Sequence, residues 1–358
     1  MSKLFESIKL RDLDIRNRIW LPPMCQYSCE NQDGIVGDWH KIHYPARAIG
    51  GFGLIIVEAT AVSPEGRISP QDAGLWNSEQ AIAWAEVNRL IHAHGAKSAV
   101  QLAHAGRKAS IYRESDGVGS ISNADGGWQT VSVSDEAFTG YEAPRTLETK
   151  EVANVVEAFA AAAERAIQAD FDAIEIHAAH GYLIHQFLSP LTNNRTDQYG
   201  GSLENRARLL IEITTAIRAR VGAGVPVLVR FSATDWADNG WDETQTIAVA
   251  KWAHEAGADM FDISSGGLIT GVSIPFEPNY QVGFAENVAE HVGQPVAAVG
   301  LITEAKQADL VLESGEIAVA LIGRAGLRDP MWPLRAAAEL GVEIDYWPAQ
   351  YARAKFKN

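Results

Sequence analysis

The chain of 358 residues has little cysteine, little positive charge and no long apolar run, and each shortage excludes a class of protein. Its two cysteines, Cys25 and Cys29, are too few for a disulfide framework or for the four thiolates of an iron–sulfur cluster. Lysine and arginine total 30 against 45 aspartates and glutamates, so the net charge of −15 argues against nucleic acid or an anionic membrane as a partner.

No run of about eighteen apolar residues occurs, and the amino terminus has no apolar signal-peptide core. We therefore expect a cytoplasmic protein. The motifs GxGxxG and GxxxxGK[ST] are also absent after the apolar runs, which weakens the case for an open, doubly wound sheet.

Short apolar runs instead recur along the chain, at 18–21, 53–60, 97–104, 173–177, 226–232, 260–265, 295–300 and 318–324. Helical patterns lie between many of them, at 78–94, 151–169, 203–221, 243–256, 281–292, 303–313 and 330–340. Strand–helix units in this order predict an α/β fold, a parallel (β/α)8 TIM barrel that forms a single domain over 1–358. The doubly wound sheet is the alternative.

Two segments do not fit the repeating unit. The chain before residue 16 alternates like a strand pair, and we expect a hairpin that plugs one end of the barrel. The segment 105–148 is rich in glycine, serine and aspartate, and it is too long for an ordinary connection. We interpret it as a lid over the active site.

The fourth apolar run leads directly into His177, His180 and Tyr182. Active sites of TIM barrels lie at the carboxyl ends of the strands, where these side chains are expected. Two imidazoles can donate hydrogen bonds to one oxygen, and a phenol can supply a proton. The pattern favours an oxyanion site with an acid beside it, although a structural role, or a zinc site with a third ligand, is also compatible with it.

The last two strands end in Gly300 and in Gly323 followed by Arg324. TIM barrels often bind phosphate at these two loops, because glycine lets backbone N–H groups approach and arginine supplies charge. A phosphate site is the interpretation, and ordinary glycine turns are the alternative.

Longer strings now point to a family. HAAHGYL at 177–183, FLSPLTNNRTDQYGGSLENRARL at 187–209, PPMCQY at 22–27 and IGR at 322–324 resemble the Old Yellow Enzyme family of flavin-dependent ene-reductases, and the likeness extends over essentially the whole chain. PPMCQY is similar to the YqjM-like branch. Val299 stands where the xenobiotic reductases of that branch are expected to carry tryptophan. The resemblance implies tightly bound FMN, NADPH or NADH as reductant, and electron-poor alkenes as substrates.

The resemblance also assigns residues to roles. FMN would be bound by Pro22, Pro23, Met24, Cys25, Ala59, Gln101, His177, Arg230, Ser264, Gly300, Gly323 and Arg324. Catalysis would involve His177, His180, Tyr182, Cys25 and Tyr27, and substrate would contact Tyr27, His177, His180, Tyr182 and Arg353. No metal is expected. Two alternatives remain: Cys25 as inert packing, and Arg230 as the partner of a carboxylate such as Glu175.

The carboxyl-terminal string 347–353 is similar to the tail that crosses a dimer interface in the YqjM-like branch. We therefore expect a homodimer, or a larger assembly of dimers, with Arg353 in the neighbour's active site. Three other functions stay open. They are a metal-dependent hydrolase that uses His177 and His180, a dienoyl-CoA reductase, which would need an iron–sulfur cluster, and a catalytically silent flavoprotein.

Overall fold

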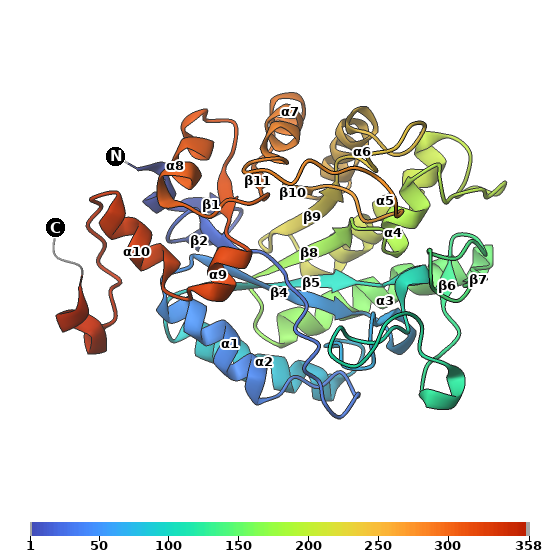
Figure 1. Cartoon of the computed structure of the whole chain (residues 1–358), viewed down its shortest axis with the longest axis horizontal. Helices are drawn as coiled ribbons and strands as arrows, with labels where there is room; N and C mark the ends of the chain where they lie inside the picture. The colour runs from blue at the N-terminus through green and yellow to red at the C-terminus, as the bar shows by residue number, and fades with distance from the viewer. Residues whose placement is uncertain (1, 356–358) are drawn as a thin grey trace.

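The computed structural model describes residues 2–355, and its centre is a closed barrel of parallel strands (Figure 1). The strands follow chain order around the barrel: β3 (Ile19–Leu21), β4 (Leu54–Ala61), β5 (Lys97–Ala103), β8 (Ala173–Ala178), β9 (Val227–Ser232), β10 (Met260–Ser264), β11 (Val296–Ala298) and β12 (Val319–Leu321). This confirms the predicted TIM barrel and excludes the doubly wound sheet. The predicted last strand ran too far, because β12 ends at Leu321 and Arg324 already begins a helix.

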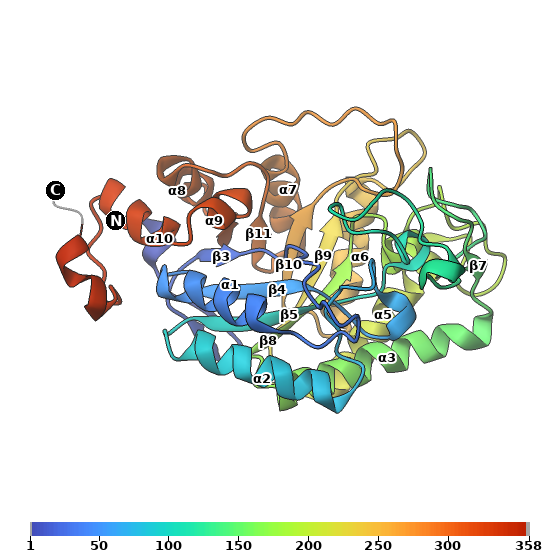
Figure 2. The same cartoon turned by 60° about the horizontal axis from the view of Figure 1, so that its bottom comes forward.

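The helices surround the barrel on its outside (Figure 2). Those predicted from the sequence are α2 (Ser78–His92), α3 (Thr149–Gln168), α5 (Leu203–Val221), α6 (Glu243–Glu255), α7 (Val282–Val292), α8 (Ala305–Glu313) and α10 (Trp332–Glu339). The sequence reading missed α1 (Asp38–Ile49), α4 (Leu183–Leu188) and α9 (Arg324–Arg328). Helix α1 contains Pro45, which obscures its pattern, and α4 and α9 are too short to show one.

Side-chain caps explain where several helices begin. Asn77 accepts a hydrogen bond from the backbone N–H of Gln80, Ser202 from that of Asn205, and Asp242 from that of Gln245. Each cap satisfies one of the free N–H groups of a first helical turn.

The amino-terminal hairpin closes one end of the barrel. Strand β1 (Ile8–Leu10) pairs antiparallel with β2 (Leu13–Ile15). Side chains of the hairpin form one buried apolar cluster with the first inward-facing residues of the barrel strands, among them Trp20, Leu54 and Met260. The predicted plug is confirmed, and it lies at the end where the strands begin.

Inside the barrel, side chains of four adjacent strands lie in tiers. Ala99, Ala173, Leu228 and Met260 of β5, β8, β9 and β10 belong to the apolar cluster at the plugged end. Side chains two residues apart on a strand point to the same face, so the next inward-facing residues are Gln101, Glu175, Arg230 and Asp262. We call these four residues the charged tier. One step further, His177, Ser232 and Ser264 face the open end.

The enlarged segment 105–148 holds two short paired strands, β6 (Val131–Ser132) and β7 (Arg145–Thr146). Figures 1 and 2 show β7 on the side of the barrel opposite the carboxyl terminus. The segment is attached to other loops by Trp128, whose Nε1 donates to the carbonyl of Glu65 at 2.9 Å, and by Arg107, whose Nη2 donates to that of Leu268 at 2.9 Å. Its action as a lid stays a prediction.

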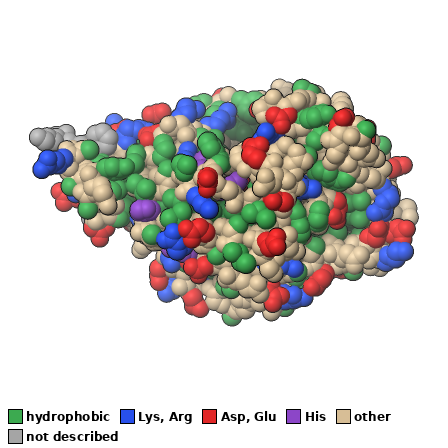
Figure 3. All heavy atoms as spheres, turned by 90° about the horizontal axis from the view of Figure 1, so that it is seen from below, with side chains coloured by type: hydrophobic (Ala, Val, Ile, Leu, Met, Phe, Trp, Pro, Cys, Tyr) green, Lys and Arg blue, Asp and Glu red, His purple; other side chains and the backbone are tan. Residues whose placement is uncertain are grey.

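The surface carries charges of both signs. On the face seen in Figure 3, acidic and basic side chains are interspersed, and no patch of one sign dominates. Among residues 2–355, none of the helices combines the length and the apolar character needed to cross a membrane.

Candidate active site

His177, His180 and Tyr182 meet at the carboxyl end of β8, as predicted. The ring centroids of His177 and His180 are 5.2 Å apart, and those of His177 and Tyr182 are 5.0 Å apart, both edge to face. The chain turns sharply between them, with φ of 59° at His180 and 73° at Gly181. A Cβ at Gly181 would lie 2.3 Å from the carbonyl oxygen of Gly267, so this approach of two loops requires glycine.

Both imidazoles are neutral at ordinary pH. Burial, followed by the charge of Arg230, holds the pKa of each well below its usual range. The backbone N–H of Ala179 donates to Nδ1 of His177 at 3.3 Å, which leaves the ring proton of His177 on Nε2. Nε2 of His180 lies 2.8 Å from Oγ of Ser264, whose own hydrogen is directed to Oε1 of Gln281. Nε2 of His180 is therefore also the N–H donor.

Tyr182 is a neutral phenol, because burial raises its pKa well above the usual value. Nζ of Lys108 lies 5.0 Å from the centre of the Tyr182 ring and donates to the carbonyls of His180 at 2.9 Å and Gly267 at 3.0 Å. Burial lowers the pKa of Lys108 to about 8. Lys108 was not among the predicted site residues, although its place soon after the third strand is the signal that could have included it.

Cys25 and Tyr27 lie in one small cluster with Tyr182 and Ile68. Burial raises the pKa of the Cys25 thiol, and the charge of a Cys25 thiolate together with burial would raise that of Tyr27. Both groups are therefore protonated. Buried Glu58 fixes their loop, because its carboxylate accepts the backbone N–H of Gln26 at 2.8 Å.

The hydroxyl of Tyr44 holds the other oxygen of that carboxylate at 2.9 Å. Tyr44 belongs to α1, so a helix that the sequence reading missed supports the loop of Cys25 and Tyr27 from behind.

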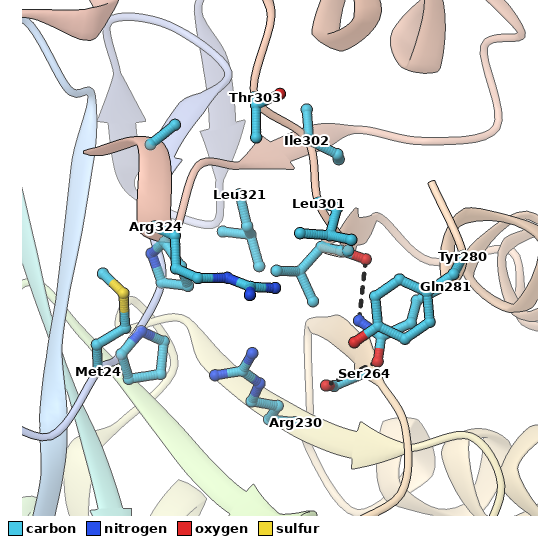
Figure 4. A pocket seen from close by; sticks show the side chains of 16 residues that line it. Met24, Arg230, Ser264, Tyr280, Gln281, Leu301, Ile302, Thr303, Leu321 and Arg324 are labelled. Atoms are coloured by element: carbon cyan, nitrogen blue, oxygen red, sulfur yellow. Dashed lines mark hydrogen bonds between the residues drawn. The ribbon is translucent and has the colours of Figure 1, made fainter. Parts of the chain in front are cut away.

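Figure 4 shows the cavity next to this site, with the guanidinium groups of Arg230 and Arg324 directed into it. It measures about 230 Å³. Predicted cofactor residues on its wall are Pro22, Pro23, Met24, Arg230, Ser264, Gly300, Gly323 and Arg324. Tyr280, Gln281 and Thr303 also line it, and the sequence offered no motif for them.

The cavity suits a phosphate-bearing cofactor. Within residues 2–355, the guanidinium of Arg324 makes no hydrogen bond or ion pair, so it is available to an anion. Gly300, after β11, has a φ of 137°, a conformation that favours glycine, and it lines the cavity. A Cβ at Gly323 would come within 3.5 Å of the Pro22 ring, and that space can admit a ligand instead. These residues would hold the FMN phosphate, and Arg230 would face the ring system.

The remaining predicted cofactor residues, Cys25, Ala59, Gln101 and His177, lie outside the wall of this cavity. Ala59 follows an irregularity of β4, and Gln101 donates to Oε1 of Glu175 at 2.8 Å. The alternative of an ion pair between Arg230 and a carboxylate is confirmed, with a partner other than the example Glu175. Nε of Arg230 lies 3.0 Å from Oδ2 of Asp262, on the next strand.

Arg353 is exposed in a short 3-10 helix, η5 (Ala349–Ala354), and does not line the cavity of its own barrel. Figures 1 and 2 show this arm beyond α10, at the edge of the molecule. A contact of Arg353 with substrate therefore stays a prediction.

Three comparisons with known proteins bear on this site. Residues 3–343 match the model of the NADH:flavin oxidoreductase / NADH oxidase family. An NADPH dehydrogenase of Halalkalibacterium halodurans is 45% identical over 352 residues, covering 98% of each chain. Morphinone reductase superposes with a TM-score of 0.79 at 30% identity, covering 96% of this chain and 91% of that one. A 2-naphthoyl-CoA reductase superposes at 0.86 with 26% identity, covering 95% of this chain but 52% of the other.

A TIM barrel with this cavity and this family match defines a flavin-dependent oxidoreductase. The chain belongs to the Old Yellow Enzyme family, and it is an FMN enzyme that takes electrons from NAD(P)H. This excludes the metal-dependent hydrolase.

Proposed function

We propose that this enzyme is an ene-reductase, which reduces the activated C=C bond of α,β-unsaturated carbonyl or nitro compounds. Bound FMN would supply the hydride that NAD(P)H has delivered to it. Nicotinamide and alkene would occupy the same place in turn, in a ping-pong cycle.

The chain's own residues would handle charge and proton. His177 and His180, as neutral Nε2–H donors, would bind the substrate's carbonyl or nitro oxygen as negative charge develops on it. His180 would exchange its hydrogen bond to Ser264 for one to the substrate. Tyr182, a protonated phenol beside His177, would donate its proton to the substrate carbon next to the activating group. Tyr27 would provide a further donor at the same place.

The observation that carries this proposal is the edge-to-face grouping of two neutral imidazoles and one protonated phenol at the open end of the barrel. The test is anaerobic stopped-flow absorbance of the holoenzyme in separate half-reactions. NADPH should bleach the flavin, and 2-cyclohexenone or a nitroalkene should restore its colour. Bleaching that no such alkene reverses would contradict the ene-reductase, and failure of NADPH to bleach the flavin would point to the silent flavoprotein.

The alternative of a CoA-ester reductase receives some support from the similarity to 2-naphthoyl-CoA reductase. This chain spans about half of that protein, and its two cysteines cannot ligate a cluster that needs four thiolates. The simple alkene reductase is therefore favoured.

A homodimer with a shared active site is part of the proposal. It is supported by the exposed position of Arg353 and by the arm that carries it away from its own barrel. Deleting residues from Tyr351 onward should weaken substrate or nicotinamide binding. A truncated protein that remains an active monomer with unchanged kinetics would contradict the shared site. The cytoplasmic location likewise stays a prediction.

A further inference from the structure

The charged tier is an unusual feature of the barrel interior, because it buries more negative than positive groups. Glu175 and Asp262 are fully buried, and Arg230 is 6% exposed. Below them lie only apolar side chains of the plugged end, such as Ala173, Leu228 and Met260. Two ionised carboxylates against one guanidinium would leave one uncompensated charge in a medium of low polarity, which is strongly unfavourable.

An ion pair shows which carboxylate has its charge compensated. Oδ2 of Asp262 lies 3.0 Å from Nε of Arg230, and the two residues are directly opposite in the register of β9 and β10. Asp262 therefore contacts the Nε side of the Arg230 guanidinium. The terminal nitrogens of Arg230 reach into the cavity (Figure 4). Asp262 is a positioning residue for Arg230.

Among the residues that the structure describes, Glu175 has a hydrogen-bond donor but no ion pair. Its Oε1 accepts from Nε2 of Gln101 at 2.8 Å, while Oε2 has no hydrogen-bond partner among the residues that the structure describes. The charged groups that face it are Arg230 on the adjacent strand β9 and Asp262 on β10, since His177 on its own strand is neutral. Neither oxygen of Asp262 accepts a hydrogen bond within the same described residues, because its contact with Arg230 is an ion pair only. A proton on Glu175 would remove the excess charge and supply one of the missing donors.

We propose that Glu175 is the proton-holding residue beneath the cofactor, and that it takes up a proton from solvent when negative charge arrives next to Arg230. This inference rests on the proposed place of Arg230 beside the FMN ring. Electrons come from NADPH as hydride, which also brings the proton that the ring acquires. The second proton comes from solvent and forms an O–H bond on the Glu175 carboxylate, so that charge and atoms balance.

The pH range of this uptake follows from the two carboxyl groups. Burial, and then the charge of Asp262, raise the pKa of Glu175 to about 8, whereas burial opposed by Arg230 raises that of Asp262 to about 6. At neutral pH, Glu175 is protonated and Asp262 is paired with Arg230. Negative charge on the reduced cofactor raises the pKa of Glu175 further. Uptake therefore occurs above pH 8, where Glu175 is ionised before reduction.

The test is the pH dependence of the midpoint potential of the FMN-loaded enzyme, measured without alkene. One proton per two electrons lowers the potential by roughly 30 mV for each tenfold fall in proton concentration, and two protons lower it by roughly 60 mV. Wild type should change from the first slope to the second above about pH 8. E175Q keeps the hydrogen bond from Gln101 but holds no proton, and it should keep the first slope throughout.

D172N is the matched control, because Asp172 stands just before the same strand at the plugged end and bonds to His92 at 2.7 Å. It should retain the change of slope. E175D, which restores a carboxyl group, should also show one, at a shifted pH. A wild type without the change of slope, or an E175Q enzyme that keeps it, would overturn the proposal, whether or not alkenes are reduced.

A second measurement uses wild-type protein, so it does not depend on a variant that folds. Infrared titration of FMN-free wild-type protein should show the carbonyl stretch of a protonated carboxylic acid, lost as the pH rises through about 8. Reduced-minus-oxidised difference spectra of the holoenzyme above that pH should show the same band gained. Absence of the band from both experiments would exclude Glu175 as a proton holder.

Discussion

The two ends of the barrel are made by the same eight strands but by opposite kinds of side chain. At the plugged end, Ile15 and Met260 share an apolar cluster that is almost entirely sealed from solvent. At the open end the side chains are polar. Lys108 donates to the carbonyl of His180, and Ser264 bonds to the His180 imidazole and lines the cavity. His177 lies at the same end, near the end of β8. Four residues along one strand are enough to pass from one environment to the other, as between Ala173 and His177.

The difference shows how this molecule keeps stability apart from chemistry. The apolar end gains free energy from burial alone, and any well-packed side chain can serve there. The open end gathers titratable groups whose pKa values burial shifts, such as the two histidines held as neutral imidazoles, and shifts of this kind are typical of reaction sites. Mutations at the two ends should therefore affect different measurements.

The largest effect is expected for Tyr182→Phe, which removes only a hydroxyl. Reoxidation of the flavin by an alkene that must be protonated at carbon should slow by about 10²–10⁴, because a positioned acid contributes that much. Reduction by NADPH should be unchanged. Stopped-flow absorbance measures both halves, and Tyr199→Phe, a tyrosine bonded to Glu212 outside the site, is the control. A loss confined to the reductive half would show that Tyr182 has another role.

The second largest effect is expected for His177→Ala. Loss of one donor to a developing oxyanion should lower alkene turnover by about 10²–10³, while FMN remains bound. Turnover is measured at saturating NADPH, and bound flavin is quantified from the visible spectrum. His254→Ala removes an imidazole from α6, far from the site in sequence, and should change neither quantity. Undiminished turnover in the His177 variant would remove that residue from the oxyanion site.

A smaller effect is expected for Lys108→Met. Hydrogen bonds from a charged donor contribute about 1.5–3 kcal/mol, so the loss of the bonds to His180 and Gly267 should slow reoxidation by about 10–10² through misplaced His180. The Lys108 charge is lost as pH rises through about 8. Wild-type reoxidation should therefore fall above that pH, and the variant should lack this fall. Lys150→Met changes an exposed position of α3, and this variant should behave like wild type.

The smallest effect on chemistry is expected at the plugged end. Ile15→Val removes one buried methylene from the apolar cluster, which should cost about 0.5–1.5 kcal/mol of unfolding free energy. Both half-reactions should keep wild-type rates. Denaturant titration and stopped-flow kinetics on the same preparation would check this. A change in either rate would show that the two ends are coupled.

Much of the fold and of the candidate site could be predicted from the sequence. The strands and longer helices carry strong periodic patterns, and His177, His180 and Tyr182 are close together in the chain. What could not be read depends on contacts between distant segments. Asp262 as the partner of Arg230 follows from strand register, and Lys108 approaches Tyr182 only after the chain folds. Gln281 reaches Ser264 from the far end of a loop with no motif.

Closure of the barrel joins Ile19 of β3 to Ala320 of β12, about 300 positions later in the chain. During synthesis at about 5–20 residues per second, β3 must therefore wait some 15–60 s for its neighbour. Trp20 and Leu21 remain without that neighbour on the ribosome for the same time. A barrel closed by its first and last strands is thus exposed to misassembly until β12 has been made, and native packing at the plugged end is completed only after that.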